Sequence, residues 1–61
     1  MTPTEAAVLE AIRAEPGLHP KEYWQRTGLT YGQATAAARR LVRAGLVRTT
    51  GRTVATRLWP T

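Results

Sequence analysis

Arginine is the residue type with the greatest capacity for chemistry in this sequence. Eight of the nine basic residues are arginines, and the chain of 61 residues carries a net charge of +5. A guanidinium offers a rigid fork of donors that suits phosphate oxygens and guanine edges better than a lysine ammonium does. All four carboxylates lie in the first 22 residues, whereas residues 25–61 hold seven arginines and no acid. The second half therefore predicts a surface that faces a polyanion.

Enzymatic and metal chemistry have little support in the residue types. The chain has no Ser, Cys or Asp, a single histidine (His19) and no glycine-rich phosphate loop. Nucleophilic catalysis and metal binding need clusters of such residues, so we expect no enzymatic activity, no cofactor and no metal site. His19 is interpreted as a helix cap or an exposed side chain.

No apolar stretch is long enough for a signal peptide or a membrane span. We expect no membrane association. We expect a cytoplasmic protein that associates with nucleic acid.

Three helices are expected, at about residues 4–14, 20–27 and 30–44. In the first, an apolar stripe has helical spacing, and the glutamates and Arg13 are left toward solvent (Val8, Leu9 and Ile12; Glu5 and Glu10). The second begins with His19 as cap and Pro20 at the first position, its Glu22 carboxylate can reach back to the cap, and Gly28 ends it.

The third helix begins at Thr30, which has capping-box spacing with Gln33. Its apolar stripe predicts the buried face (Ala34, Ala37, Ala38, Leu41 and Val42). Gly32 near its start is unusual for a helix. It either permits close approach to a nucleic-acid backbone or is a tolerated substitution.

The segment after Gly45 changes to the alternating pattern of strands. Residues 46–50 and 53–59 predict a hairpin with Gly51 and Arg52 at its tip, and Pro60 is expected to end the second strand. Val54 and Leu58 are expected on the same face of that strand. The fold class is therefore mostly α with a small β-hairpin (α+β), in a single domain over residues 1–61.

Four short segments carry a resemblance to a known family. They are PGLHPKE at 16–22, TGLT at 27–30, RRLVRAGLVR at 39–48 and GR at 51–52. From Glu5 to Leu58 the chain resembles the winged helix-turn-helix domains of bacterial regulators of the MarR, ArsR and IclR type. The resemblance implies a three-helix winged helix-turn-helix whose third helix enters the major groove and whose hairpin forms the wing.

The sequence departs from the family pattern in its core and its length. Tyr23 and Trp24 stand where a leucine and a small residue are usual, while Ala34 and Ala38 replace branched aliphatics. We expect the two rings to fill the space that the alanines leave. The extra helices of such regulators have no counterpart here, so no small-molecule effector is expected.

The expected DNA contacts fall into three groups. Base edges would be met from the first part of the third helix (Tyr31, Gln33, Thr35, Ala36 and Arg39). The DNA backbone would be met by residues around the helices (Thr30, Lys21, Arg26, Arg40 and Arg43), and the wing would add Arg48, Arg52 and Arg57. For Gln33 the capping box alone is an equal interpretation, for Tyr31 a partly buried aromatic, and for Arg43 a solvated face.

These patterns favour a double-stranded DNA-binding protein, either a small repressor-like transcriptional regulator or a phage or plasmid DNA-binding factor. We expect a homodimer, because one small domain offers few base contacts. The alternative is a winged-helix module that binds proteins instead of DNA, for which an exposed Trp59 would provide an apolar patch. Architectural or single-stranded nucleic-acid binding is a third hypothesis.

Overall fold

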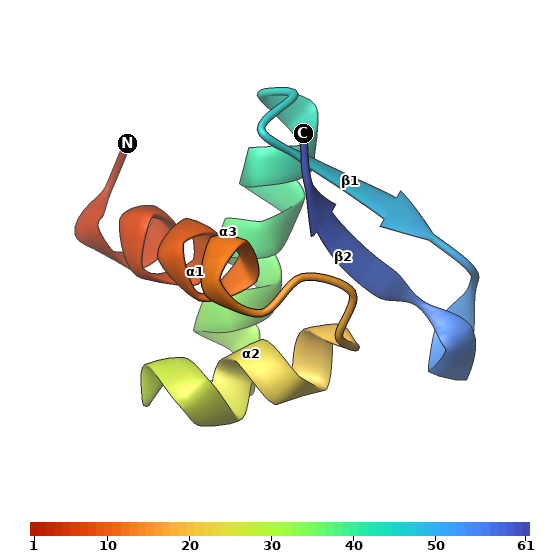
Figure 1. Ribbon diagram of the computed structural model, residues 1–61. Coiled ribbons are helices and arrows are strands. Elements are labelled where there is room, and N and C mark those ends of the chain that lie inside the picture. The colour runs from red at the N-terminus through yellow and green to blue at the C-terminus, as the bar shows by residue number, and fades with distance from the viewer.

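Three helices and a two-stranded antiparallel hairpin make up the fold, a winged helix. The computed structural model describes all residues 1–61. Its elements are α1 (Pro3–Ala14), α2 (Pro20–Thr27), α3 (Tyr31–Arg43), β1 (Val47–Thr50), the short 3-10 helix η1 (Thr53–Ala55) and β2 (Arg57–Pro60). Figure 1 shows the hairpin leaving the end of α3 and extending away from the helices. The predicted helices are confirmed to within one residue at each end.

The helix boundaries follow from their caps. The Oγ1 atom of Thr30 accepts the backbone N–H of Gln33 (3.2 Å), and Gln33 Oε1 accepts the N–H of Thr30 (3.1 Å), which completes the predicted capping box. His19 caps α2 as expected, through Nδ1. Gly28 ends α2 at a φ of 71°, a left-handed conformation that other residues adopt only with strain. Gly28 and the Thr30 capping box fix the tight turn between α2 and α3.

The core is built from one face of each helix and one side chain from each strand. Its buried cluster comprises Val8, Leu9 and Ile12 of α1, Tyr23 of α2, Ala37, Ala38 and Leu41 of α3, and Val47 and Leu58 of the wing. Tyr23 belongs to this cluster, together with Ala38, and is 1% exposed. Tyr23 is therefore a core residue, as expected.

The Tyr23 hydroxyl joins three parts of the chain. It donates to the backbone carbonyl of Glu15 (2.6 Å) and accepts the backbone N–H of Leu18 (3.2 Å). The Leu58 carbonyl of β2 lies 3.5 Å away. Burial raises the pKa of this hydroxyl, and its hydrogen bond from Leu18 acts in the opposite direction. Tyr23 therefore fixes the end of α1, the segment before α2 and the wing relative to one another.

The second strand of the wing was predicted too long at its start and too short at its end. Residues Thr53–Ala55 form a 3-10 turn instead of strand, and Val54 is 86% exposed rather than on the face of the buried Leu58. The hairpin strands are therefore 47–50 and 57–60. The hairpin starts one residue after the predicted start at 46 and ends one residue after the predicted end at 59.

Pro60 belongs to β2, where it pairs with Val47, and so does not end the strand as expected. The N–H and carbonyl of Leu58 bond outward to Leu18 and Gly17 (3.0 and 2.7 Å). The backbone N–H and carbonyl groups of successive strand residues point alternately toward and away from the paired strand. Those of Pro60, two residues after Leu58, therefore also point away from β1, and its missing N–H costs the hairpin no hydrogen bond.

Three further expectations about side chains were wrong. Val42 does not extend the buried face of α3 but is 37% exposed. The Glu22 carboxylate does not reach back to the cap; it pairs with Arg26 one turn later, at 2.9 Å. Glu5 is not free in solvent, since its side chain is only 16% exposed and lies 3.8 Å from Arg40. In each case an arginine binds the carboxylate, for Glu22 in place of the helix cap and for Glu5 in place of solvent.

No helix in the fold is both long enough and apolar enough to cross a membrane.

Candidate nucleic-acid interface

The outward face of α3 is flat at its start and basic at its end. Gly32, Ala36, Arg39 and Arg43 are all exposed and follow one another at intervals of four, three and four residues. At 3.6 residues per turn, these positions lie opposite the buried stripe of alanines and Leu41. We refer to these four residues as the outward face of α3.

The beginning of α3 presents polar groups that its own cap partly occupies. Thr30 and Gln33 are exposed but bonded to each other through the capping box. The Gln33 side chain would have to give up its bond to the Thr30 N–H in order to bind adenine with both amide atoms. Thr35 is half-buried at the edge of the outward face.

Tyr31 is the exposed aromatic at the start of α3, at 55%. Its ring meets that of Trp24 edge to face, with centroids 5.8 Å apart and an interplanar angle of 81°. Trp24 is thus not a core residue as interpreted from the sequence; it is half-buried and supports Tyr31 from α2. The packing holds the Tyr31 ring in place and leaves the rest of it accessible.

Two of the predicted backbone contacts are engaged within the protein. Arg26 bonds to Glu15 (3.0 Å) and Glu22 (2.9 Å), and these hydrogen bonds, that to Glu15 first, raise its pKa above the ordinary value. Arg40 lies 3.8 Å from Glu5. Lys21, by contrast, is exposed near the start of α2 and forms no ion pair.

The wing carries three exposed arginines, none of which forms an ion pair (Arg48, Arg52 and Arg57). Arg48 stacks over the Trp59 ring opposite it in the hairpin, with its guanidinium carbon 5.5 Å from the ring centroid. Arg52 stands at the tip, between Gly51 at a φ of 74° and the 3-10 turn. A Cβ atom at Gly51 would collide with the Ala55 carbonyl, so glycine is required for the tip to close over that group.

Trp59 is held against the body of the protein and is only half-exposed. A Cβ atom on Gly17 would lie 2.6 Å from its Cη2 atom, and its Nε1 donates to Thr50 Oγ1 at 2.8 Å. The expected apolar patch at Trp59, which favoured a protein-binding module, is therefore largely covered by the protein itself.

Charge is distributed unevenly, because α3 and the wing carry arginines and no acid. The four glutamates lie on α1, on α2 and in the residue that follows α1, and three of them, all but Glu10, pair with Arg26 or Arg40. The arginines without ion pairs in the second half all lie on α3 or the wing (Arg39, Arg43, Arg48, Arg52 and Arg57). A positive field is thus concentrated over the third helix and the hairpin.

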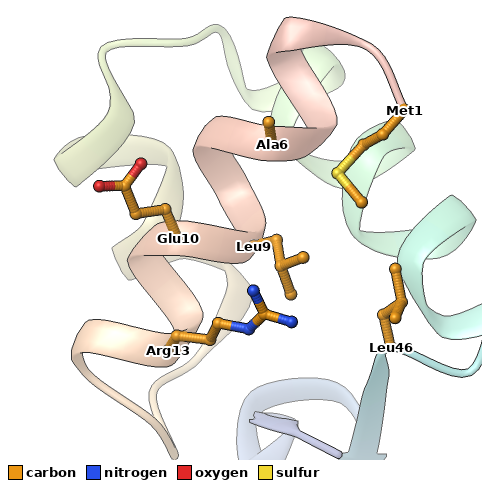
Figure 2. A pocket seen from close by; sticks show the side chains of 6 residues that line it. All are labelled: Met1, Ala6, Leu9, Glu10, Arg13 and Leu46. Carbon is orange, nitrogen blue, oxygen red and sulfur yellow. The ribbon is translucent and has the colours of Figure 1, made fainter.

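A shallow groove lies elsewhere, between the outer side of α1 and the turn after α3. Figure 2 shows its lining side chains, among them Leu9 at its floor, Leu46 opposite, and Glu10 and Arg13 at the rim; its volume is about 430 Å³. No group of three or more His, Cys, Asp and Glu side chains that could hold a metal ion occurs in the structure. The groove therefore offers an apolar surface with two charges at its edge.

Comparison with known proteins gives consistent results. Residues 1–57 match the sequence model described as the MarR family. The PcaV transcriptional regulator from Streptomyces coelicolor, solved in complex with its natural ligand, is 31% identical over all of this chain, with a TM-score of 0.89. Another structure of that regulator is 32% identical over 98% of this chain, with a TM-score of 0.87.

A MarR family protein from Bacillus stearothermophilus has the same fold, with a TM-score of 0.85 at 23% identity over all of this chain. The chain spans 44–46% of the length of these three structures. No curated protein sequence gives a significant match.

Proposed function

This chain belongs to the MarR family, and on that premise we propose that residues 1–61 bind double-stranded DNA as the DNA-binding unit of a transcriptional regulator. The observation that carries the proposal is the separation of charge. α3 and the wing, the two elements that a winged helix presents to DNA, carry no acid, and five of their six arginines form no ion pair. The similar PcaV protein is a transcriptional regulator.

We assign sequence readout to the outward face of α3. Arg39 is exposed and unpaired, so it can bond to the O6 and N7 atoms of guanine. Ala36 and the methyl group of Thr35 can touch a thymine methyl, and Tyr31 extends the surface toward the neighbouring base step. Gln33 contributes first as the cap, with its amide nitrogen left as a donor.

Contacts to the DNA backbone come from the flanks of that face. Arg43 lies one turn beyond Arg39, while Thr30 and Lys21 stand near the helix starts, where free backbone N–H groups favour phosphate. Arg52 at the tip is the wing residue best placed for the minor groove, with Arg48 and Arg57 behind it. Arg26 and Arg40 contribute less, because glutamates neutralise them.

The experiment is a titration of the chain with duplex DNA over a series of salt concentrations. About four to six phosphate contacts per protomer predict that log K falls with log salt at about 0.9 per contact. Arg52→Ala should lower that slope by about 1, and Arg39→Ala should weaken binding at one base position. Arg13→Ala is the matched control, because it removes the same charge from the rim of the α1 groove (Figure 2). Absence of binding at low salt, or equal effects of all three substitutions, would contradict the proposal.

We further propose that the regulator acts as a homodimer. A single outward face reads few bases, and two-fold symmetric half-sites are the usual way to extend such a site. Sedimentation of the chain with and without a duplex carrying two half-sites tests this, and a monomer in both states would contradict it. We do not retain the expectation that no small-molecule effector acts on the protein, because the similar PcaV regulator was solved with its natural ligand.

A further inference from the structure

The wing tip has a contact with the helical body that its strands do not provide. His19 Nδ1 accepts the backbone N–H of Lys21 at 3.1 Å, which caps α2. On the other side of the ring, Nε2 lies 3.2 Å from the backbone carbonyl oxygen of Thr53, 34 residues away. Because a backbone N–H donates to Nδ1, the ring proton resides on Nε2, and Nε2 donates to Thr53. Figure 1 shows the beginning of α2 facing the tip of the hairpin.

The tip has little regular structure of its own to hold it. Gly51 and Thr53 both have positive φ values, and Thr53 is the one non-glycine residue in that region, at 48°. The turn is closed by two backbone bonds, from Ala55 to the Arg52 carbonyl (2.9 Å) and from Thr56 to the Thr53 carbonyl (3.2 Å). The Thr53 carbonyl thus accepts one bond from within the turn and one from His19. A strained backbone of this kind persists when its surroundings support it.

The rest of the wing is attached to the helical body through β2. Trp59 packs on Gly17, and Leu58 exchanges two backbone bonds with the segment before α2. Those contacts fix β2 but end before the tip, which begins beyond Thr50 on one strand and before Arg57 on the other. His19 is the point at which a side chain of the helical body is bonded to the tip.

We infer that His19 is a positioning residue for the wing: it holds the tip so that Arg52 is presented to DNA in a fixed place relative to α3. The inference rests on the proposed DNA-binding function. Arg52 directly precedes Thr53, so the bond to Thr53 sets the position of the Arg52 backbone. A tip ordered before binding loses less conformational entropy when it meets the nucleic acid.

Asparagine at position 19 separates the two roles of the histidine. Asparagine is a good helix cap but its side chain is too short to reach the wing, so His19→Asn keeps α2 and removes the bond to Thr53. Releasing the tip should weaken duplex binding by about fivefold, near the lower end of what ordering one residue is worth. His19→Ala removes both roles and should also lower the melting temperature.

The decisive experiment is a double-mutant cycle for duplex affinity with His19→Asn and Arg52→Ala. We expect His19→Asn to weaken binding in the native chain and to have no further effect once Arg52 is alanine. An equal effect in both backgrounds, or no effect in the native chain, would overturn the inference.

A second measurement does not depend on DNA. Backbone amide relaxation of residues 52–56 should show greater mobility in His19→Asn, while residues 57–60 remain as in the native chain. Unchanged mobility at the tip would overturn the inference. If the native chain failed to bind duplex DNA while the tip became mobile, the proposed function would fail and the tether would stand.

Discussion

Replacing Tyr23 by phenylalanine removes one oxygen atom from the point where α1, the segment before α2 and the wing meet. The ring stays in the core, where it is 1% exposed, so the substitution leaves packing unchanged. The lost atom donates to the Glu15 carbonyl at 2.6 Å and accepts the Leu18 N–H at 3.2 Å. Two backbone groups therefore lose their partner at once.

The cost can be worked out bond by bond. Glu15 is exposed, so water can replace the hydroxyl at its carbonyl, and the loss there is about 0.5 kcal/mol. Leu18 is half-buried, and leaving its N–H without a partner costs about 1 kcal/mol or more. The sum is about 1.5 kcal/mol, which in a domain of this size lowers Tm by roughly 6–12 °C.

The assay is reversible thermal unfolding of the native chain, Tyr23→Phe and Tyr31→Phe. Tyr31 is the matched control, because its hydroxyl forms no hydrogen bond within the protein and its ring is 55% exposed. We expect Tyr31→Phe to change stability by less than about 0.5 kcal/mol. Equal melting temperatures for the two variants would refute the role assigned to the Tyr23 hydroxyl.

Three further predictions follow from named contacts. Burial raises the pKa of Tyr23 in the folded state, so the hydroxyl stabilises the fold fully below the unfolded pKa of about 10, and this stabilisation is lost as pH rises above that value. Urea unfolding from about pH 8 to about pH 11 should therefore show that the difference in unfolding free energy between the native chain and Tyr23→Phe becomes smaller. Gly17→Ala should lower the free energy of unfolding by about 2 kcal/mol or more, because Gly17 has a φ of 82° and an added Cβ collides with Trp59. Gly28→Ala is the control, since the space around it is open and only the strain of its φ is added. Equal losses of stability to urea in the two variants would contradict the Trp59 contact. Gly32→Ala should raise stability by about 1 kcal/mol, because an added Cβ meets nothing there, and should weaken duplex binding if DNA approaches that face closely; a lower Tm would contradict the structure around it.

The helices could be predicted from sequence because their ends are set locally. Thr30 with Gln33, His19 with Pro20, and Gly28 each specify a helix terminus within four residues of chain. The order of the elements followed from the same patterns, and the structure confirms it.

The wing tip could not be predicted because its conformation depends on distant groups. Threonine and valine at 53–54 have strand propensity, yet the turn they form is held by His19 from the start of α2. Proline usually ends a strand because it lacks a backbone N–H. In β2 the backbone groups of Leu58 bond to Gly17 and Leu18 and not to β1, so two residues later Pro60 also occupies a position that needs no N–H toward β1.

The sequence predicted which arginines could belong to the candidate interface, but not which of them are engaged in ion pairs within the protein. Residues 25–61 contain no acid, and the structure places six of their seven arginines on α3 and the wing. The spacing of Glu22 and Arg26 on α2 could have predicted their ion pair. Sequence alone gave no means of seeing that Arg26 also bonds to Glu15 or that Arg40 approaches Glu5, because those pairs depend on how α1 ends and on how α1 packs on α3.

The measurement that tests the central claim most directly is a titration of the labelled chain with duplex DNA, followed by backbone amide chemical shifts. We predict that the shifts move for the outward face of α3 and for the wing around Arg48 and Arg52, while Ala6 and Glu10 at the α1 groove stay unchanged. Shifts confined to α1, or no shifts at low salt, would contradict the assignment of α3 and the wing as the DNA-binding surface.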